Sequence, residues 1–115
     1  MKKLLFVLNV SVLSSSLHAA NWTNGLQAVD ATIWRPGYHG FYVTAANFDD
    51  PEGCRTNSRE NMYLFDPAFE AADPKTTDRL YAMILSAQAT GKKLHVFVDG
   101  CVGQYPKITG LQLNK

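Results

Sequence analysis

The stretch DPKTTDRLYAMILSAQATGKKLHVFVD, residues 73–99, decides the fold. It opens with a helix start, because Asp73 is a favoured N-cap residue and Pro74 fits the first helical position. Apolar residues then recur at helical spacing until Gly91, the expected C-cap residue, so the pattern predicts a helix over 74–90. The residues that follow alternate in side-chain character, which is typical of a strand.

Strand patterns lie on both sides of this helix. The expected strands are residues 25–35, 41–46, 61–65, 94–99 and 107–113. The chain is therefore expected to be mainly β, of the α+β class, with the element order of an OB-fold. That fold is a five-stranded barrel, here with one helix between strands 3 and 4. A generic α+β sandwich fits the same elements.

The predicted helix carries little charge over its second half. Small residues occupy the face that its main apolar stripe leaves over, namely Ala82, Ser86 and Ala89. Such a helix is expected to be either deeply buried or covered by another subunit. These three residues are therefore candidate interface residues for a homo-oligomer.

The N-terminus has the pattern of a secretory signal peptide. Two lysines precede a ten-residue, largely apolar run at 4–13, and small residues allow cleavage after Ala19 or Ala20. The run is too short to cross a membrane, which takes about 20 apolar residues. We therefore expect a signal peptide at 1–20, one OB-like domain at 21–115, and a secreted or periplasmic protein without a membrane span after cleavage.

Length and charge exclude several classes of protein. The chain has 115 residues and a formal net charge of +1, and removal of the predicted signal leaves nine basic and ten acidic side chains. One domain of this size leaves no room for a multi-domain enzyme. A net charge of −1 argues against nucleic acid as a partner, because phosphate binding requires a cationic excess.

The two cysteines, Cys54 and Cys101, are expected to form a disulfide, because an exported protein meets an oxidising compartment. The bond would close a loop worth about 4 kcal/mol in the chain-entropy model. Metal binding is the weaker alternative, since two isolated cysteines are half a structural zinc site.

No catalytic motif or cofactor-binding loop is present, so the expected protein is not an enzyme and takes no cofactor. The enzymatic alternative is a small hydrolase that pairs His39 or His95 with Asp99. An acidic cluster at residues 49–52 lacks the ligand spacing of a calcium loop. We expect it to be a solvated turn, and we expect no metal site.

Aromatic residues give the best candidate ligand site. Trp34, Tyr38, His39 and Tyr42 lie on either side of a Pro- and Gly-containing turn that brings them together. Flat rings stack on sugars while neighbouring polar groups fix the orientation of the ligand. These four residues are the candidate ligand-binding group.

Three short stretches resemble a known family. They are Asn21-Trp22-Thr23 at the mature N-terminus, residues 89–98 at the junction of helix and strand, and Tyr105-Pro106. They are similar to the B subunits of AB5 toxins of the subtilase-cytotoxin and typhoid-toxin type, although the chain is shorter and its cysteine arrangement differs. The resemblance implies an OB-fold, ring-shaped oligomers and glycan binding.

Together these observations predict a secreted or periplasmic binding module that is not an enzyme, binds glycan and forms homo-oligomers like a toxin B subunit. The alternative is an envelope protein that binds or inhibits another protein through the same aromatics and the small-residue helix face.

Overall fold

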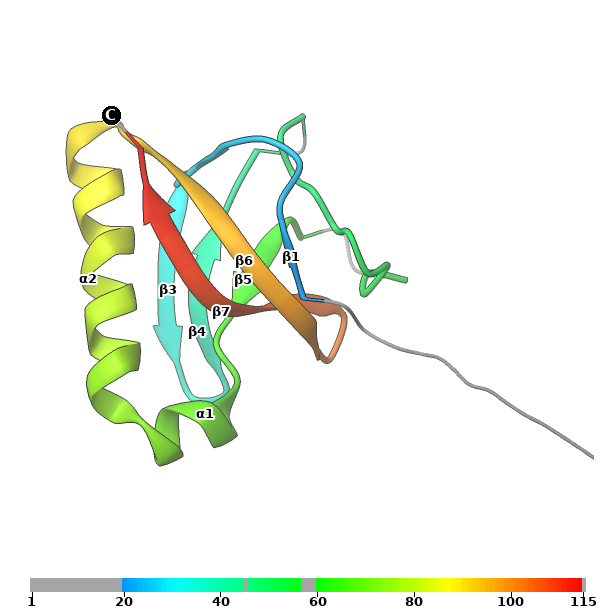
Figure 1. Cartoon of the computed structure of the whole chain (residues 1–115), viewed down its shortest axis with the longest axis vertical. Helices are drawn as coiled ribbons and strands as arrows, with labels where there is room; N and C mark the ends of the chain where they lie inside the picture. Colours follow the sequence, from blue (N-terminus) through cyan, green and yellow to red (C-terminus); the bar gives the residue numbers. More distant parts are fainter. Residues whose placement is uncertain (1–19, 45, 57–59, 115) are drawn as a thin grey trace, which may run out of the picture.

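The structure is a computed structural model that describes residues 20–44, 46–56 and 60–114 (Figure 1). These residues form a seven-stranded mixed sheet and two helices, which confirms a mainly β, α+β fold. The predicted signal peptide lies outside the described residues, apart from Ala20. In chain order, the elements are β1 (Asn21–Trp22), β2 (Gln27–Ala28), β3 (Ala31–Arg35), β4 (Tyr38–Tyr42), β5 (Met62–Leu64), α1 (Pro67–Ala72), α2 (Pro74–Thr90), β6 (Lys93–Val102) and β7 (Tyr105–Leu113).

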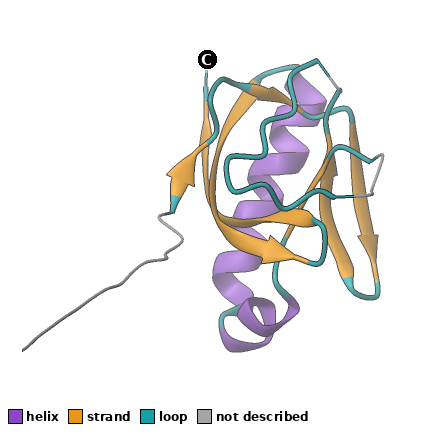
Figure 2. Cartoon of the chain, turned by 90° about the vertical axis from the view of Figure 1, so that its right-hand side faces the viewer, coloured by secondary structure: helices purple, strands orange, loops and turns teal. Residues whose placement is uncertain are grey.

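The strands follow the order β1-β6-β7-β5-β4-β3, and β2 also pairs with β6. The pairing of β5 with β7 is parallel, and the others are antiparallel. Helix α2 runs along the sheet and contacts β3, β6 and β7 (Figures 1 and 2). The sheet therefore has one face directed toward α2 and one face turned away from it.

The single strand predicted at 25–35 is wrong. The chain forms two short strands, β1 and β2, on β6 and then moves to β4 as β3. The break lies between β2 and β3: Ala28 pairs with β6, while the Asp30 N–H already donates to the Tyr42 carbonyl of β4 over 2.9 Å. Side chains can alternate across such a change of partner, so an alternating pattern does not ensure one strand.

The second strand was predicted to begin at residue 41, but β4 already begins at Tyr38. Tyr38 is already paired with Arg35, so the turn between β3 and β4 contains only Pro36 and Gly37. Gly37 has φ 79°, and proline followed by such a residue is typical of a type II turn. Because the turn is this tight, the aromatic residues on both sides of it belong to strands.

Helix α2 is confirmed at 74–90, with Asp73 as N-cap and Gly91 in the left-handed conformation as C-cap. Helix α1 is not among the predicted elements. Asp66 and Pro67 directly follow the strand expected at 61–65, where such a pair is typical of a strand end. The same pair also caps a helix: the Asp66 carboxylate accepts the Ala68 N–H over 3.0 Å, and Pro67 opens the helix.

The last two strands are longer than predicted. Strand β6 continues to Val102 and β7 begins at Tyr105, so most of the loop expected at 100–106 belongs to a hairpin. The hairpin turns at Gly103, which has φ 61°. A β-bulge after Val98 shifts the register in this region, which hides the strand from a strict alternation rule.

The core lies between α2 and the sheet. Ile84 and Ala87 of α2 pack in one cluster with the alternating Leu94, Val96 and Val98 of β6. Thr77 is the third buried residue of the helix. Of the two alternatives expected for this helix, deep burial within the chain is therefore not observed. The candidate interface residues of α2 are all exposed; they are Ala82, Ser86 and Ala89. Their coverage by another subunit stays a prediction.

The predicted disulfide is confirmed. Cys54 and Cys101 are bonded, with their Cα atoms 5.6 Å apart, and the bond fastens the segment between β4 and β5 to the far end of β6. Among the described residues, no helix is long and apolar enough to span a membrane.

Candidate functional site

The four predicted ligand residues all lie on the β3–β4 hairpin, but on two different faces. Side chains alternate across a strand, and Trp34 and His39 are direct partners in the pairing. They face α2, where Trp34 meets Tyr81. Tyr38 and Tyr42 belong to the opposite, outer face. The structure therefore brings the predicted group together as two pairs.

The two residues of the pair facing α2 contact each other and both helices. The Trp34 and His39 rings stack with their centroids 3.6 Å apart and an interplanar angle of 6°. Tyr81 of α2 meets Trp34 edge-on at 4.4 Å, and burial raises the pKa of its hydroxyl. The His39 Nδ1 atom lies 2.8 and 2.5 Å from the two carboxylate oxygens of Glu70 in α1. These contacts tie the hairpin to both helices.

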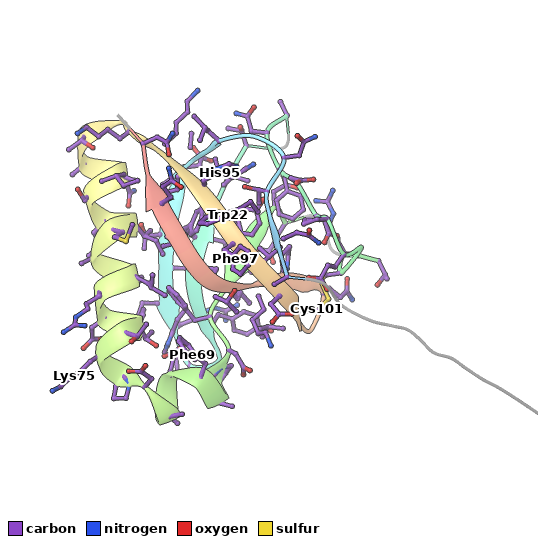
Figure 3. The ribbon with its side chains drawn as sticks, viewed as in Figure 1. Trp22, Phe69, Lys75, His95, Phe97 and Cys101 are labelled. Carbon is purple, nitrogen blue, oxygen red and sulfur yellow. A yellow bond between two sulfur atoms is a disulfide. The ribbon has the colours of Figure 1, made fainter. Side chains whose placement is uncertain are left out.

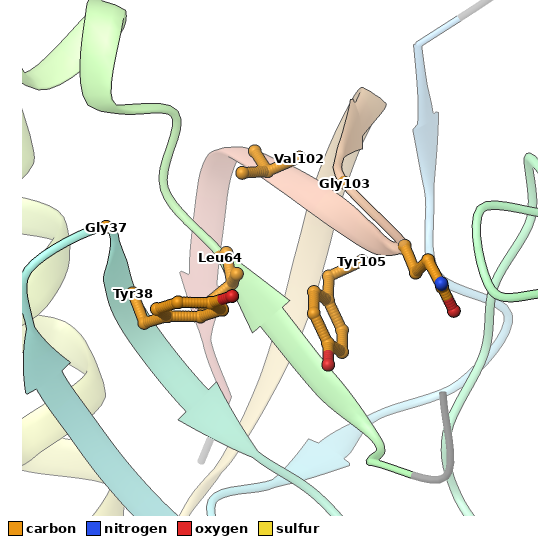
Figure 4. Close-up of a pocket in the computed structure, with 7 residues that line it drawn as sticks. Gly37, Tyr38, Leu64, Val102, Gly103 and Tyr105 are labelled. Atoms are coloured by element: carbon orange, nitrogen blue, oxygen red, sulfur yellow. The ribbon is translucent and has the colours of Figure 1, made fainter. Parts of the chain in front are cut away.

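The outer face borders a hollow of about 710 Å³ (Figure 4). Two tyrosine rings, Tyr38 of β4 and Tyr105 of β7, lie on either side of Leu64 of β5. Gly37 and residues 102–104 complete the lining, so the two hairpin turns contribute to one site. A concave site with aromatic walls is the arrangement in which small ligands commonly bind.

Charged groups accompany these rings. The Arg35 guanidinium lies 4.3 Å from the centre of the Tyr38 ring. Glu60 accepts hydrogen bonds from the Tyr42 and Tyr105 hydroxyls over 3.3 and 3.0 Å. Burial, followed by the nearby Glu60 carboxylate, raises the pKa of the Tyr42 hydroxyl. The outer face therefore offers rings, hydroxyls, a carboxylate and a guanidinium together.

Sequence reasoning missed three members of this group: Arg35, Glu60 and Tyr105. Tyr105 is 63 residues from Tyr42 in the chain. It joins the site because β7 pairs in parallel with β5, with Leu64 opposite Lys107. Only the aromatic character of Tyr105 was a signal in the sequence, and no local pattern predicts this parallel pairing.

In the part of the chain that the structure describes, His39 and His95, the two histidines of the hydrolase alternative, are bonded to groups other than Asp99. His39 is bound to Glu70, and the Nε2 atom of His95 lies 2.8 Å from the Thr23 carbonyl oxygen. His95 and Phe97 of β6 also contact the Trp22 ring, with centroids 5.2 and 4.9 Å away (Figure 3).

The acidic cluster has a structural role. Asp50 accepts the backbone N–H groups of Cys54 and Arg55 over 2.9 and 2.8 Å, and Glu52 accepts the Gly100 N–H over 3.0 Å. These carboxylates hold the loop in place around the disulfide. The cluster was expected to be a solvated turn, and these hydrogen bonds show that it also has a structural role. Within the part of the chain that the structure describes, no three His, Cys, Asp or Glu side chains gather in a metal-binding arrangement.

Comparison with protein-family models, with curated proteins and with solved structures found no match to this chain. The case for function therefore rests on the residues and their geometry.

Proposed function

We propose that the chain is a secreted or periplasmic binding module that is not an enzyme and that holds a glycan in the hollow between Tyr38 and Tyr105. The observation that carries the proposal is the pair of tyrosine rings on either side of this hollow. A sugar ring has one apolar face that stacks on an aromatic side chain and a rim of hydroxyls that need hydrogen-bond partners.

The polar groups near the hollow suit such a ligand. The Glu60 carboxylate accepts hydrogen bonds, and the Arg35 guanidinium has several N–H groups that donate them. The tyrosine hydroxyls can both donate and accept. Arg35 and Glu60 carry opposite charges, so neither sign dominates the outer face. This balance favours a hydroxyl-rich ligand over a nucleic acid, which would need a cationic groove.

We further propose that the sheet is an OB-type barrel similar to that of toxin B subunits. The OB-fold is a partly open barrel, so it tolerates an unpaired edge. The N-terminal segment supports the proposal because it joins the two halves of the sheet: β1 and β2 pair with β6, while β3 pairs with β4. A solved structure in which β5 does not pair with β7, so that the two halves are separate sheets, would contradict this proposal.

A glycan array, followed by calorimetric titration of the sugars that bind, tests the proposed function. We expect Tyr105→Ala and Tyr38→Ala each to weaken binding about tenfold, which corresponds to the loss of one stacked ring. Trp22→Ala is the matched control, since Trp22 is an exposed aromatic residue, 45% accessible, that does not line the hollow. Binding that falls equally in the control, or an array without any bound sugar, would contradict the proposal.

A further inference from the structure

Strand β3 ends the sheet and leaves one edge open. It stands last in the strand order and pairs, within the described residues, only with β4. An open edge presents unpaired backbone groups that another strand can take up. Natural sheets commonly protect such edges with charges, proline or a cover. The central residues of β3, which are Thr32, Ile33 and Trp34, carry none of these charges.

The hydrogen bonds of β4 show which backbone groups point outward. The Val43 N–H donates to the Asn61 carbonyl, and the Phe65 N–H donates to the His39 carbonyl, so the odd-numbered residues of β4 bond toward β5. Backbone groups alternate in direction along an antiparallel strand, so the even-numbered residues of β4 bond toward β3. Their partners in β3 are Ala31, Ile33 and Arg35. The N–H and C=O groups of Thr32 and Trp34 therefore point to the open edge.

Exposed apolar side chains adjoin this edge. Trp34 is 49% exposed although it stacks on His39, and Leu85 of α2 is 46% exposed. Leu85 lies one helical turn after Tyr81 and three residues before Gln88, so it shares their side of α2. Tyr81 contacts Trp34, and Gln88 accepts a hydrogen bond from Thr32. Leu85 therefore extends an apolar surface from β3 onto the helix, toward the small residues Ala82 and Ala89.

We infer that this edge binds a second copy of the chain, with the two β3 strands antiparallel about a two-fold axis at Ile33. In this register, Thr32 of each copy exchanges backbone hydrogen bonds with Trp34 of the other. The charges at the ends of the strand fit the same arrangement. Asp30 precedes β3 and Arg35 ends it, so antiparallel pairing places the acidic end of each strand beside the basic end of its partner. A two-fold interface requires such self-complementarity.

Charge reversal tests this dimer by sedimentation velocity over a range of concentrations. We expect the purified protein to have twice the mass of the chain. We expect Arg35→Glu and Asp30→Arg each to weaken dimerisation about tenfold, because each places like charges at both ends of the pair. The double variant Asp30→Arg/Arg35→Glu restores the attraction and should restore the dimer. Leu85→Lys should also weaken it, whereas Leu26→Lys, at a residue 38% exposed and outside β3 and α2, serves as the control.

Amide hydrogen exchange tests the register. The Thr32 and Trp34 amides should exchange slowly in the dimer and rapidly when dilution or Arg35→Glu separates the copies, while the Ile33 amide, bonded toward β4, stays protected in both states. A monomer at all concentrations overturns the inference, and so does an oligomer larger than two. A dimer that survives both single reversals, or Thr32 and Trp34 amides that remain unprotected in it, also overturns it. Mass and amide exchange are measured without glycan, and Asp30→Arg and Leu85→Lys change residues that do not line the hollow, so failure of the dimer and failure of the proposed glycan site are distinguishable.

Discussion

The two faces of the β3–β4 hairpin carry similar aromatic residues in different surroundings. On the face toward α2, Trp34 and His39 stack on each other and are held by Tyr81 and Glu70. On the outer face, Tyr38 borders a hollow of about 710 Å³. Exposure does not separate the two faces, because Trp34 is 49% exposed and Tyr38 is 36% exposed. The difference shows that a ring near a turn is a ligand candidate where it borders a hollow, and not where a second ring and a helix side chain already contact it.

A side chain at Gly40 should have the largest effect, because it would disturb both faces of the hairpin. A Cβ atom at this position would overlap the Tyr63 carbonyl oxygen, which belongs to the backbone and has little room to move. We expect Gly40→Ala to lower the free energy of unfolding by about 3 kcal/mol. Denaturant titration measures the loss.

Gly110→Ala is the control for the Gly40 variant. Its Cβ atom would lie 3.3 Å from the Phe97 Cβ atom, a tight contact that a small shift relieves, whereas the Cβ atom at position 40 would overlap the Tyr63 carbonyl oxygen. We therefore expect Gly110→Ala to lower the free energy of unfolding less than Gly40→Ala does. Equal losses at the two glycines would show that the close approach of β4 to β5 has no special role.

Alanine substitutions on the two faces should separate stability from binding. Trp34→Ala removes the ring stack and the edge contact with Tyr81, so we expect it to lower the free energy of unfolding by about 1.5 kcal/mol. Tyr38→Ala should lower the free energy of unfolding by less than about 1 kcal/mol, because the Tyr38 ring loses only a cation–π contact with the Arg35 guanidinium, and it should weaken the proposed glycan binding. Thermal unfolding and calorimetric titration of both variants measure the contrast. The comparison fails if Tyr38→Ala is the more destabilising of the two.

The smallest expected change in stability is at Asp73, the N-cap of α2, and it should depend on pH. Because Asp73 lies away from the hollow, it tests stability separately from binding. The Thr76 hydroxyl and then its backbone N–H donate to the Asp73 carboxylate, which lowers the pKa of Asp73 from its ordinary value of 3.8. Because the pKa of Asp73 is lower in the folded state, the ionised Asp73 carboxylate makes its full contribution to stability at neutral pH. It is lost as the pH falls through the folded-state pKa.

Asp73→Ala should therefore unfold more easily than the parent at neutral pH, and the gap should narrow below about pH 4. Asp73→Asn keeps a capping side chain without a titrating group and is the control, so its gap to the alanine variant should not narrow in the same way. Unfolding midpoints measured across this pH range give the test. The proposed glycan binding at the outer face should not change, because no residue of α2 lines the hollow.

Local signals predicted much of the fold. Helix α2 was predicted because Asp73, Pro74 and Gly91 each fix the backbone within a few residues of themselves. The disulfide was predicted because the chain has two cysteines and an apparent export signal, and it is present. Helix α1 was missed because Asp66-Pro67 has two local meanings, a strand end and a helix cap, and both apply here.

The candidate site was predicted only in part. Tyr38 and Tyr42 belong to the expected group, but Tyr105 and Glu60 reach them through pairings between distant segments. Helix packing decided that Trp34 and His39 contact the protein itself.

The sequence by itself determined the mainly β class, the extent of α2, the cysteine pair and the aromatic hairpin. The class, the helix and the hairpin depend on residues close together in the chain or on a pattern that repeats along it. The cysteine pair is 47 residues apart and was predicted because the sequence contains only two cysteines. Only the tertiary structure decided that the first predicted strand divides between β6 and β4, that α2 exposes its small residues, and that β5 pairs in parallel with β7. These features depend on contacts between segments far apart in the chain, where no local periodicity carries information about the partner.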